Sequence, residues 1–123
     1  MHIDLDHFKK INDTLGHGAG DSVLVLVSEN LRDLVGSRGL VCRIGGDEFV
    51  VLLEHFVDET EVYELCQDII DLMAQPMFIH EQAKTFGLSL GCAMGRGDVA
   101  DASEVFINAN VALYAAKSDG RSC

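Results

Sequence analysis

The chain has 123 residues, of which 48% are hydrophobic and only one is proline, a composition that predicts one folded domain with a single core. Its formal net charge of −11 argues against binding to nucleic acid and against contact with an anionic membrane surface, because both partners require surplus positive charge. A phosphorylated ligand would therefore need metal ions or a few well-placed basic residues.

The first part of the chain predicts one strand and two helices. Apolar and polar residues alternate over residues 2–6, as expected of a half-buried strand. Asp6 is placed to cap a short helix, which we expect the glycine-rich segment 16–20 to break. Asp21 and Ser22 are suitable caps for a second, longer helix.

Two apolar runs within residues 40–53 predict a hairpin. They flank Gly45 and Gly46, a pair suited to the positive φ angles of a tight two-residue turn. The turn would place Asp47 and Glu48 at the beginning of the second strand.

The second half of the chain predicts a helix, another hairpin and a final helix. Asp58 resembles the first residue of a capping box, and Pro76 ends the helix that follows. We expect a hairpin between residues 77–80 and 84–94, whose second strand has small residues on one face, where a helix could pack closely. Asp101-x-x-Glu104 would open the last helix, which would run to about Lys117.

The predicted order β-α-α-β-β-α-β-β-α favours an α+β fold, with an antiparallel-dominated central sheet and helices packed on its faces. The four cysteines are widely separated, without Cys-x-x-Cys spacing, so we expect free, buried thiols in a reducing compartment. No apolar run reaches the ~18 residues of a membrane span, and no signal-peptide pattern opens the chain, so we expect a cytoplasmic domain.

Several charged residues are candidates for chemistry. Asp4 lies near the end of one predicted strand and Asp47 at a hairpin tip, so the two would converge if their strands are neighbours. Carboxylate pairs suit Mg²⁺, although acidic hairpin tips are usually only solvated. Lys9, Lys117 and Arg121 could contact phosphates, but each taken singly is more simply explained as a surface residue.

The motifs together resemble the GGDEF domain of diguanylate cyclases. RIGGDEF at residues 43–49 follows DLDHFKKIND at residues 4–13, and LSLGCA at residues 88–93 is similar to a later strand of the family. ALYAAK with a following Gly-Arg pair, at residues 112–121, resembles the closing segment of the family. The resemblance covers nearly the whole chain in the family's order.

The resemblance implies a palm-like fold related to adenylyl cyclases, with a ferredoxin-like βαββαβ core. It also implies the condensation of two GTP into cyclic di-GMP and two pyrophosphates. Two Mg²⁺ ions per site, replaceable by Mn²⁺, would be held by the Asp4 and Asp47 carboxylates and the Leu5 carbonyl.

The resemblance also assigns roles to other residues. Asp47, Glu48 and Lys9 would be catalytic, with Asp47 accepting the proton of the 3′-hydroxyl and Lys9 stabilising charge on the phosphates. The remaining positions would bind the substrate: Asn12, His17, Asp21, Gly45, Gly46, Lys117 and Arg121. Among these, Asn12 and Asp21 would contact the guanine, and Lys117 and Arg121 the triphosphate.

Departures from the family pattern leave a second interpretation open. Gly36 and Gly39 stand where the family usually carries the Arg and Asp of a product-inhibition site, and the usual N-terminal helical segment and final strand are missing from residues 1–123. We expect a homodimer with a second GGDEF domain, and sensory or phosphodiesterase domains in a longer protein that could be membrane-tethered. The alternative is a non-catalytic GTP-binding module that regulates an attached phosphodiesterase.

Overall fold

The computed structural model describes residues 1–96 and 101–123. The elements, in chain order, are β1 (His2–Leu5), α1 (Phe8–Leu15), α2 (His17–Val35), the short 3₁₀ helix η1 (Gly36–Arg38), β2 (Gly39–Gly45), β3 (Glu48–Leu53), α3 (Glu59–Met73), β4 (Met77–Ile79), β5 (Gln82–Lys84), β6 (Leu88–Gly91) and α4 (Ala102–Ser118).

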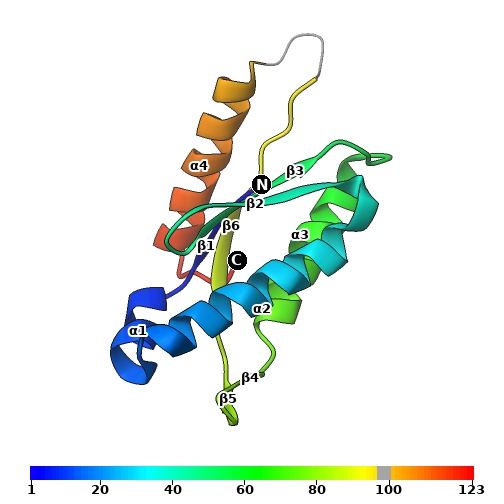
Figure 1. Ribbon diagram of the computed structural model, residues 1–123. Helices are drawn as coiled ribbons and strands as arrows, with labels where there is room; N and C mark the ends of the chain where they lie inside the picture. The colour runs from blue at the N-terminus through cyan, green and yellow to red at the C-terminus, as the bar shows by residue number, and fades with distance from the viewer. Residues whose placement is uncertain (97–100) are drawn as a thin grey trace.

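The central sheet is antiparallel and has the strand order β2-β3-β1-β6. Helices α2 and α3 lie on one side of this sheet and α4 lies on the other (Figure 1). The expected α+β architecture is confirmed. Because β1 is an inner strand, residues near its end are surrounded by β3, β6 and α4.

Side-chain alternation along the inner strands gives the sheet two different faces. Ile3 and Leu5 of β1, together with Phe49 and Val51 of β3, belong to the hydrophobic core. The same core contains residues of α2 and α3: Val23, Val27, Leu31, Leu65, Ile69 and Met73. The intervening residues, including Asp4, therefore face α4, and the polar chemistry lies on that side of the sheet.

Helix α4 packs directly against β6 at Gly91. A Cβ atom at this position would overlap the carbonyl oxygen of Ala109 and the amide nitrogen of Leu113. The prediction that a small-residue face would accept a helix is confirmed. This close packing holds α4 beside β1 and so places its C-terminal end near Asp4.

The predicted second hairpin is only partly correct. β4 pairs with β5 in a separate two-stranded sheet, around a turn at His80 and Glu81, which both have positive φ. The long strand expected over residues 84–94 is wrong, because the hairpin ends at Lys84 and β6 joins the central sheet through β1.

Two predictions about the first helices are also wrong. α1 follows His7, which has a φ of 58° and makes no side-chain capping bond, so Asp6 does not cap this helix. α2 begins at His17 rather than near Asp21, so Gly18 and Gly20 lie inside the helix. Only Gly16, with a φ of 87°, separates the two helices.

Other local predictions are confirmed. The Asp58 carboxylate caps α3 by accepting from the Glu61 amide at 3.1 Å, and the Asp101 carboxylate caps α4 by accepting from the Ser103 amide. All four cysteines are free. Cys42 and Cys123 are exposed, however, so the expectation that the thiols are buried is wrong for these two. Within residues 1–96 and 101–123, no helix is both long and apolar enough to span a bilayer.

Candidate functional site

The acidic hairpin is built differently from the sequence prediction. Gly45 pairs with Glu48, so the turn residues are Gly46 and Asp47 rather than the two glycines. A register shift between Arg43 and Gly45 precedes the turn. The Arg43 Nε atom donates a hydrogen bond of 3.0 Å to the Gly46 carbonyl and braces the hairpin. Asp47 therefore lies in the turn itself, and only Glu48 begins the strand.

The pairing of β1 with β3 brings the acidic residues together. Asp4 is directly opposite Glu48 in the antiparallel register, and the Leu5 amide donates to the Asp47 carbonyl at 3.1 Å. The condition on which the sequence prediction depended, that the two strands are neighbours, is met. Three carboxylates thus gather at one end of β1.

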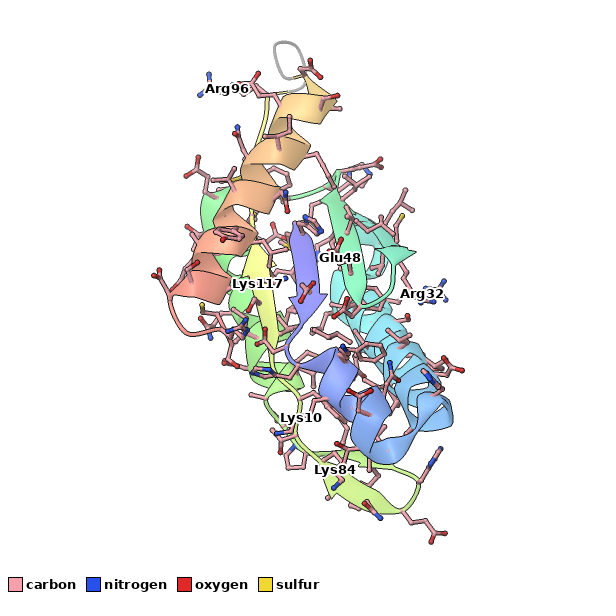
Figure 2. All side chains as sticks on the ribbon, turned by 90° about the vertical axis from the view of Figure 1, so that its left-hand side faces the viewer. Lys10, Arg32, Glu48, Lys84, Arg96 and Lys117 are labelled. Carbon is pink, nitrogen blue, oxygen red and sulfur yellow. The ribbon has the colours of Figure 1, made fainter. Side chains whose placement is uncertain are left out.

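Asp4 is the most buried of these carboxylates, with 8% of its surface exposed. Its Oδ2 atom lies 3.0 Å from the Lys117 Nζ atom, which extends from α4. Figure 2 shows Lys117 and Glu48 on either side of β1. Burial raises the pKa of Asp4, the hydrogen bond from Lys117 opposes this rise, and the nearby charges of Asp47 and Glu48 add to it.

The donor set at Asp4 fits Mg²⁺. Among the described residues, no group of three or more His, Cys, Asp or Glu side chains is arranged to hold a metal ion. An ion here would thus rely on two carboxylates, with carbonyl, water or phosphate oxygens completing its coordination, which is ordinary for Mg²⁺. A cation would also relieve the repulsion that helps raise the pKa of Asp4. The metal assignment of Asp4, Leu5 and Asp47 stays a prediction.

His2 is a site residue that sequence reasoning missed. Its side chain is buried, and its Nε2 atom lies 3.4 Å from Glu48 Oε2. Because an ionised carboxylate only accepts, Nε2 carries the proton of this hydrogen bond. The ring also stacks on Phe106 of α4, with centroids 5.2 Å apart. The i, i+2 spacing from Asp4 was the available signal, since it places both residues on one face of the strand.

The two residues expected to contact guanine lie where α1 meets α2. A Cβ atom at Gly20 would overlap the Asn12 side-chain oxygen. The Asn12 amide therefore packs against α2 at Gly20, the residue just before Asp21. Asp21 also lines an open cavity of about 440 Å³ beside the hairpin residue Arg43. This volume lies in the range of small-ligand pockets.

The structure does not bring every predicted residue to the carboxylates. Lys9 and His17 are exposed on α1 and α2. Arg121 lies four residues after Lys117, in a turn where its φ is 66°. Among the described residues, only Lys117 of the predicted cationic residues forms an ion pair with Asp4.

The whole chain, residues 1–123, matches the family described as diguanylate cyclase, GGDEF domain. It is 36% identical over 122 residues to the cyclic di-GMP phosphodiesterase NbdA of Pseudomonas aeruginosa, covering 99% of this chain and 16% of NbdA. It is equally similar, at 36% over 122 residues, to the bifunctional diguanylate cyclase/cyclic di-GMP phosphodiesterase MucR of the same organism, covering 99% of this chain and 18% of MucR. The chain thus spans less than a fifth of the length of these relatives.

Among solved structures, the GGDEF domain of TpbB from Pseudomonas aeruginosa superposes with a TM-score of 0.88 at 35% identity. The match covers 99% of this chain and 76% of the TpbB chain. The similarity therefore extends over the sheet, the helices and the hairpin that carries Asp47.

Proposed function

Because the chain belongs to the GGDEF family of diguanylate cyclase domains, we propose that it condenses two molecules of GTP into cyclic di-GMP and two pyrophosphates. In a longer protein this reaction would supply a second messenger to attached or separate receptors. The family membership supports cyclic di-GMP metabolism in general, and the geometry of the site supports the specific reaction.

The observation that carries the proposal is the position of Asp4. It is buried, opposite Glu48, beside the Asp47 turn, and 3.0 Å from Lys117. Burying a carboxylate is costly unless cations compensate it. In a protein with a net charge of −11, an acidic cluster with an inward-facing lysine suits a metal-bound triphosphate better than a purely structural role.

In the proposed reaction, the 3′-hydroxyl oxygen of one GTP attacks the α-phosphorus of the other. A new P–O bond forms, the bond to the pyrophosphate oxygen breaks, and Asp47 takes the hydroxyl proton. Mg²⁺ bound at Asp4 and Asp47 would neutralise charge on the phosphates and on the leaving pyrophosphate. Lys117, Arg121 and Lys9 would hold the phosphates, and Asn12 and Asp21 the guanine.

Two copies of the chain are needed for this reaction. Each offers one acidic hairpin and one Asn12–Asp21 pair, hence one nucleotide site. Cyclic di-GMP is made by two such attacks, so two sites must face each other with each hydroxyl in line with the opposite phosphorus. The active form we propose is therefore a homodimer with GTP between the chains.

A direct assay tests the proposal. The chain is incubated with GTP and Mg²⁺, and products are separated by liquid chromatography and identified by mass. We expect cyclic di-GMP and pyrophosphate in a 1:2 ratio, and no product from the Asp47→Asn variant. Absence of cyclic di-GMP at protein concentrations that support dimers would refute the cyclase proposal.

One comparison favours a second candidate function, a GTP-binding regulatory module. NbdA, which contains the matching segment, is named only as a phosphodiesterase. In that role, the chain would bind GTP without converting it and would alter the activity of an attached phosphodiesterase. Measured GTP binding without product in the assay above, together with GTP-dependent phosphodiesterase activity of the longer protein, would favour this alternative.

A further inference from the structure

We propose that Asp6 is a positioning residue that fixes the turn carrying Arg121 against the end of β1. The three residues that make this attachment, Asp6, Gly87 and Ser122, are called the Asp6 latch below. The inference rests on the proposed function, because it gives Arg121 its place beside the triphosphate.

The Asp6 carboxylate is fully engaged with two separate segments. Only 7% of the residue is exposed. Its Oδ1 atom accepts from the Ser89 hydroxyl at 2.8 Å, and its Oδ2 atom accepts from the Ser122 amide at 2.9 Å and from the Ser122 hydroxyl at 3.5 Å. One carboxylate thus connects the end of β1 with β6 and with the chain that follows α4. Hydrogen bonds to an ionised acceptor are among the stronger ones in proteins.

The backbone that Asp6 holds has an unusual conformation. Arg121 and Ser122 both have left-handed φ angles, of 66° and 52°. Consecutive residues other than glycine rarely adopt this region, and they persist there only when surrounding contacts hold them. Besides the Asp6 bonds, the Arg121 amide donates to the Ala116 carbonyl at 3.1 Å and the Leu90 amide donates to the Cys123 carbonyl at 2.8 Å. Asp6 thus holds this backbone through a side-chain carboxylate, in addition to the two main-chain contacts.

Gly87 provides the space that the latch requires. A Cβ atom there would lie 2.5 Å from the Ser122 hydroxyl oxygen and 3.0 Å from Asp6 Oδ2. The Gly87 carbonyl also accepts from the Asp6 amide at 2.9 Å. The glycine is therefore needed for close approach of the chain rather than for an unusual φ of its own.

The latch and the candidate metal site lie on one short stretch of chain, because Asp4 belongs to β1 and Asp6 directly follows its last residue, Leu5. Asp4 pairs with Lys117, and two residues later Asp6 holds the turn that contains Arg121. Of the two cationic residues near the end of α4 that would bind phosphate, Lys117 is thus paired with one carboxylate, and the residue after Arg121 is held by the other. Since both oxygens of Asp6 already accept hydrogen bonds, its role differs from that of a metal ligand.

The test measures nucleotide binding without turnover. The probe is 3′-deoxy-GTP with Mg²⁺, which lacks the attacking hydroxyl and cannot be cyclised, and its affinity is measured by calorimetry. Asp6→Asn replaces one acceptor oxygen by a donor. We expect its affinity to fall roughly tenfold, which is about the worth of one charged hydrogen bond.

A double-mutant cycle shows whether Asp6 acts through Arg121. If Asp6 acts through Arg121, Asp6→Asn should weaken nucleotide binding only slightly in a chain that already carries Arg121→Ala. Ser89→Ala is the matched control, because it removes the other hydrogen bond of the same carboxylate and leaves Ser122 attached, so it should change affinity less than about twofold. Additive losses from Asp6→Asn and Arg121→Ala, or equal losses from Ser89→Ala and Asp6→Asn, would overturn the proposal.

A second readout is independent of nucleotide. The Ser122 amide should exchange slowly with solvent in the parent and in Ser89→Ala, and rapidly in Asp6→Asn, as measured by NMR hydrogen exchange. Slow exchange of the Ser122 amide in Asp6→Asn contradicts the latch, even if the chain does not bind GTP at all. Rapid exchange in this variant, together with no cyclic di-GMP formed by the parent, refutes only the cyclase proposal. If Asp6→Asn does not fold, Gly87→Ala replaces it in both experiments, because its Cβ crowds the same contacts; unchanged affinity and exchange would then overturn the inference.

Discussion

Two glycines in α2 provide a sharp test of the proposed guanine contact. Gly18 and Gly20 lie in the same helix, but their surroundings differ. A Cβ atom at Gly18 would meet nothing within 4 Å, whereas one at Gly20 would overlap the Asn12 side-chain oxygen and lie 3.4 Å from the Phe8 ring. Changing each glycine to alanine therefore applies the same chemical change with and without displacement of Asn12.

The expected free energies follow from these surroundings. Alanine is favoured over glycine by about 1 kcal/mol within a helix. Gly18 is the second residue of α2, so only part of this interior value applies there, but nothing opposes the gain, and the unfolding temperature should rise by about 2–8 °C per kcal/mol gained. For Gly20→Ala the gain is offset because the Asn12 amide must rotate away, and we expect a free energy of unfolding within about 1 kcal/mol of the parent.

Nucleotide affinity should separate the two variants differently, because only Gly20→Ala should lose binding. Loss of the Asn12 hydrogen bond to guanine is worth about 1.5 kcal/mol, or about a tenfold loss of 3′-deoxy-GTP affinity in Gly20→Ala. Gly18→Ala should bind like the parent, and Asn12→Ala should match Gly20→Ala. Calorimetric titration and thermal unfolding of all four proteins measure these quantities. Parental affinity in a folded Gly20→Ala variant, or equal losses in the two glycine variants, would refute the guanine role of Asn12.

Three further predictions concern the metal site, the dimer and the response to acid. Asp4→Ala and Asp47→Ala should each abolish cyclic di-GMP formation at saturating Mg²⁺ while circular dichroism stays parental; near-parental turnover in either variant would exclude its metal role. The rate should rise with the square of protein concentration when dilute, and fusion to a coiled coil should raise the rate per chain roughly tenfold; first-order kinetics that the fusion leaves unchanged would rule out the two-chain reaction. The Val57 amide and then the Arg38 guanidinium stabilise ionised Glu61 and lower its pKa below the ordinary value of 4.5. Because the folded pKa is the lower one, this stabilisation is present above the unfolded pKa and is lost as pH falls through the folded pKa. Between about pH 5 and 3, acid should therefore reduce the unfolding free energy of the parent more steeply than that of Glu61→Gln, as measured by urea titration. Parallel curves for the two proteins would contradict the lowered pKa.

The sequence was most informative where local rules govern structure. Helices α3 and α4 were predicted with their capping residues, Asp58 and Asp101, because a cap acts on amides within three residues of itself. The antiparallel architecture and the close contact of a helix with Gly91 followed from side-chain alternation. The motifs around Asp4 and Asp47 belonged to a resemblance to one family over nearly the whole chain, and the family model matches residues 1–123.

The errors arose where long-range contacts compete with local preferences. Asp6 is a good helix cap by sequence, but its carboxylate instead bonds Ser89 and Ser122, which lie 83 and 116 residues away. Gly18 and Gly20 look like helix breakers, yet α2 continues through them, and at Gly20 the absence of a side chain admits Asn12 of α1. Local propensity could not reveal either outcome, because the deciding partner belongs to another element.

By itself, the sequence determined the types of residue at the site and their order along the chain. Only the tertiary structure decided their pairings: β1 placed Asp4 opposite Glu48, α4 carried Lys117 to Asp4, and the same strand buried His2 against Glu48 and Phe106. The physical reason lies in strand register and helix packing. A register is fixed by the whole hydrophobic face of the sheet, so the meeting of polar side chains on its other face follows from core contacts that no short motif contains.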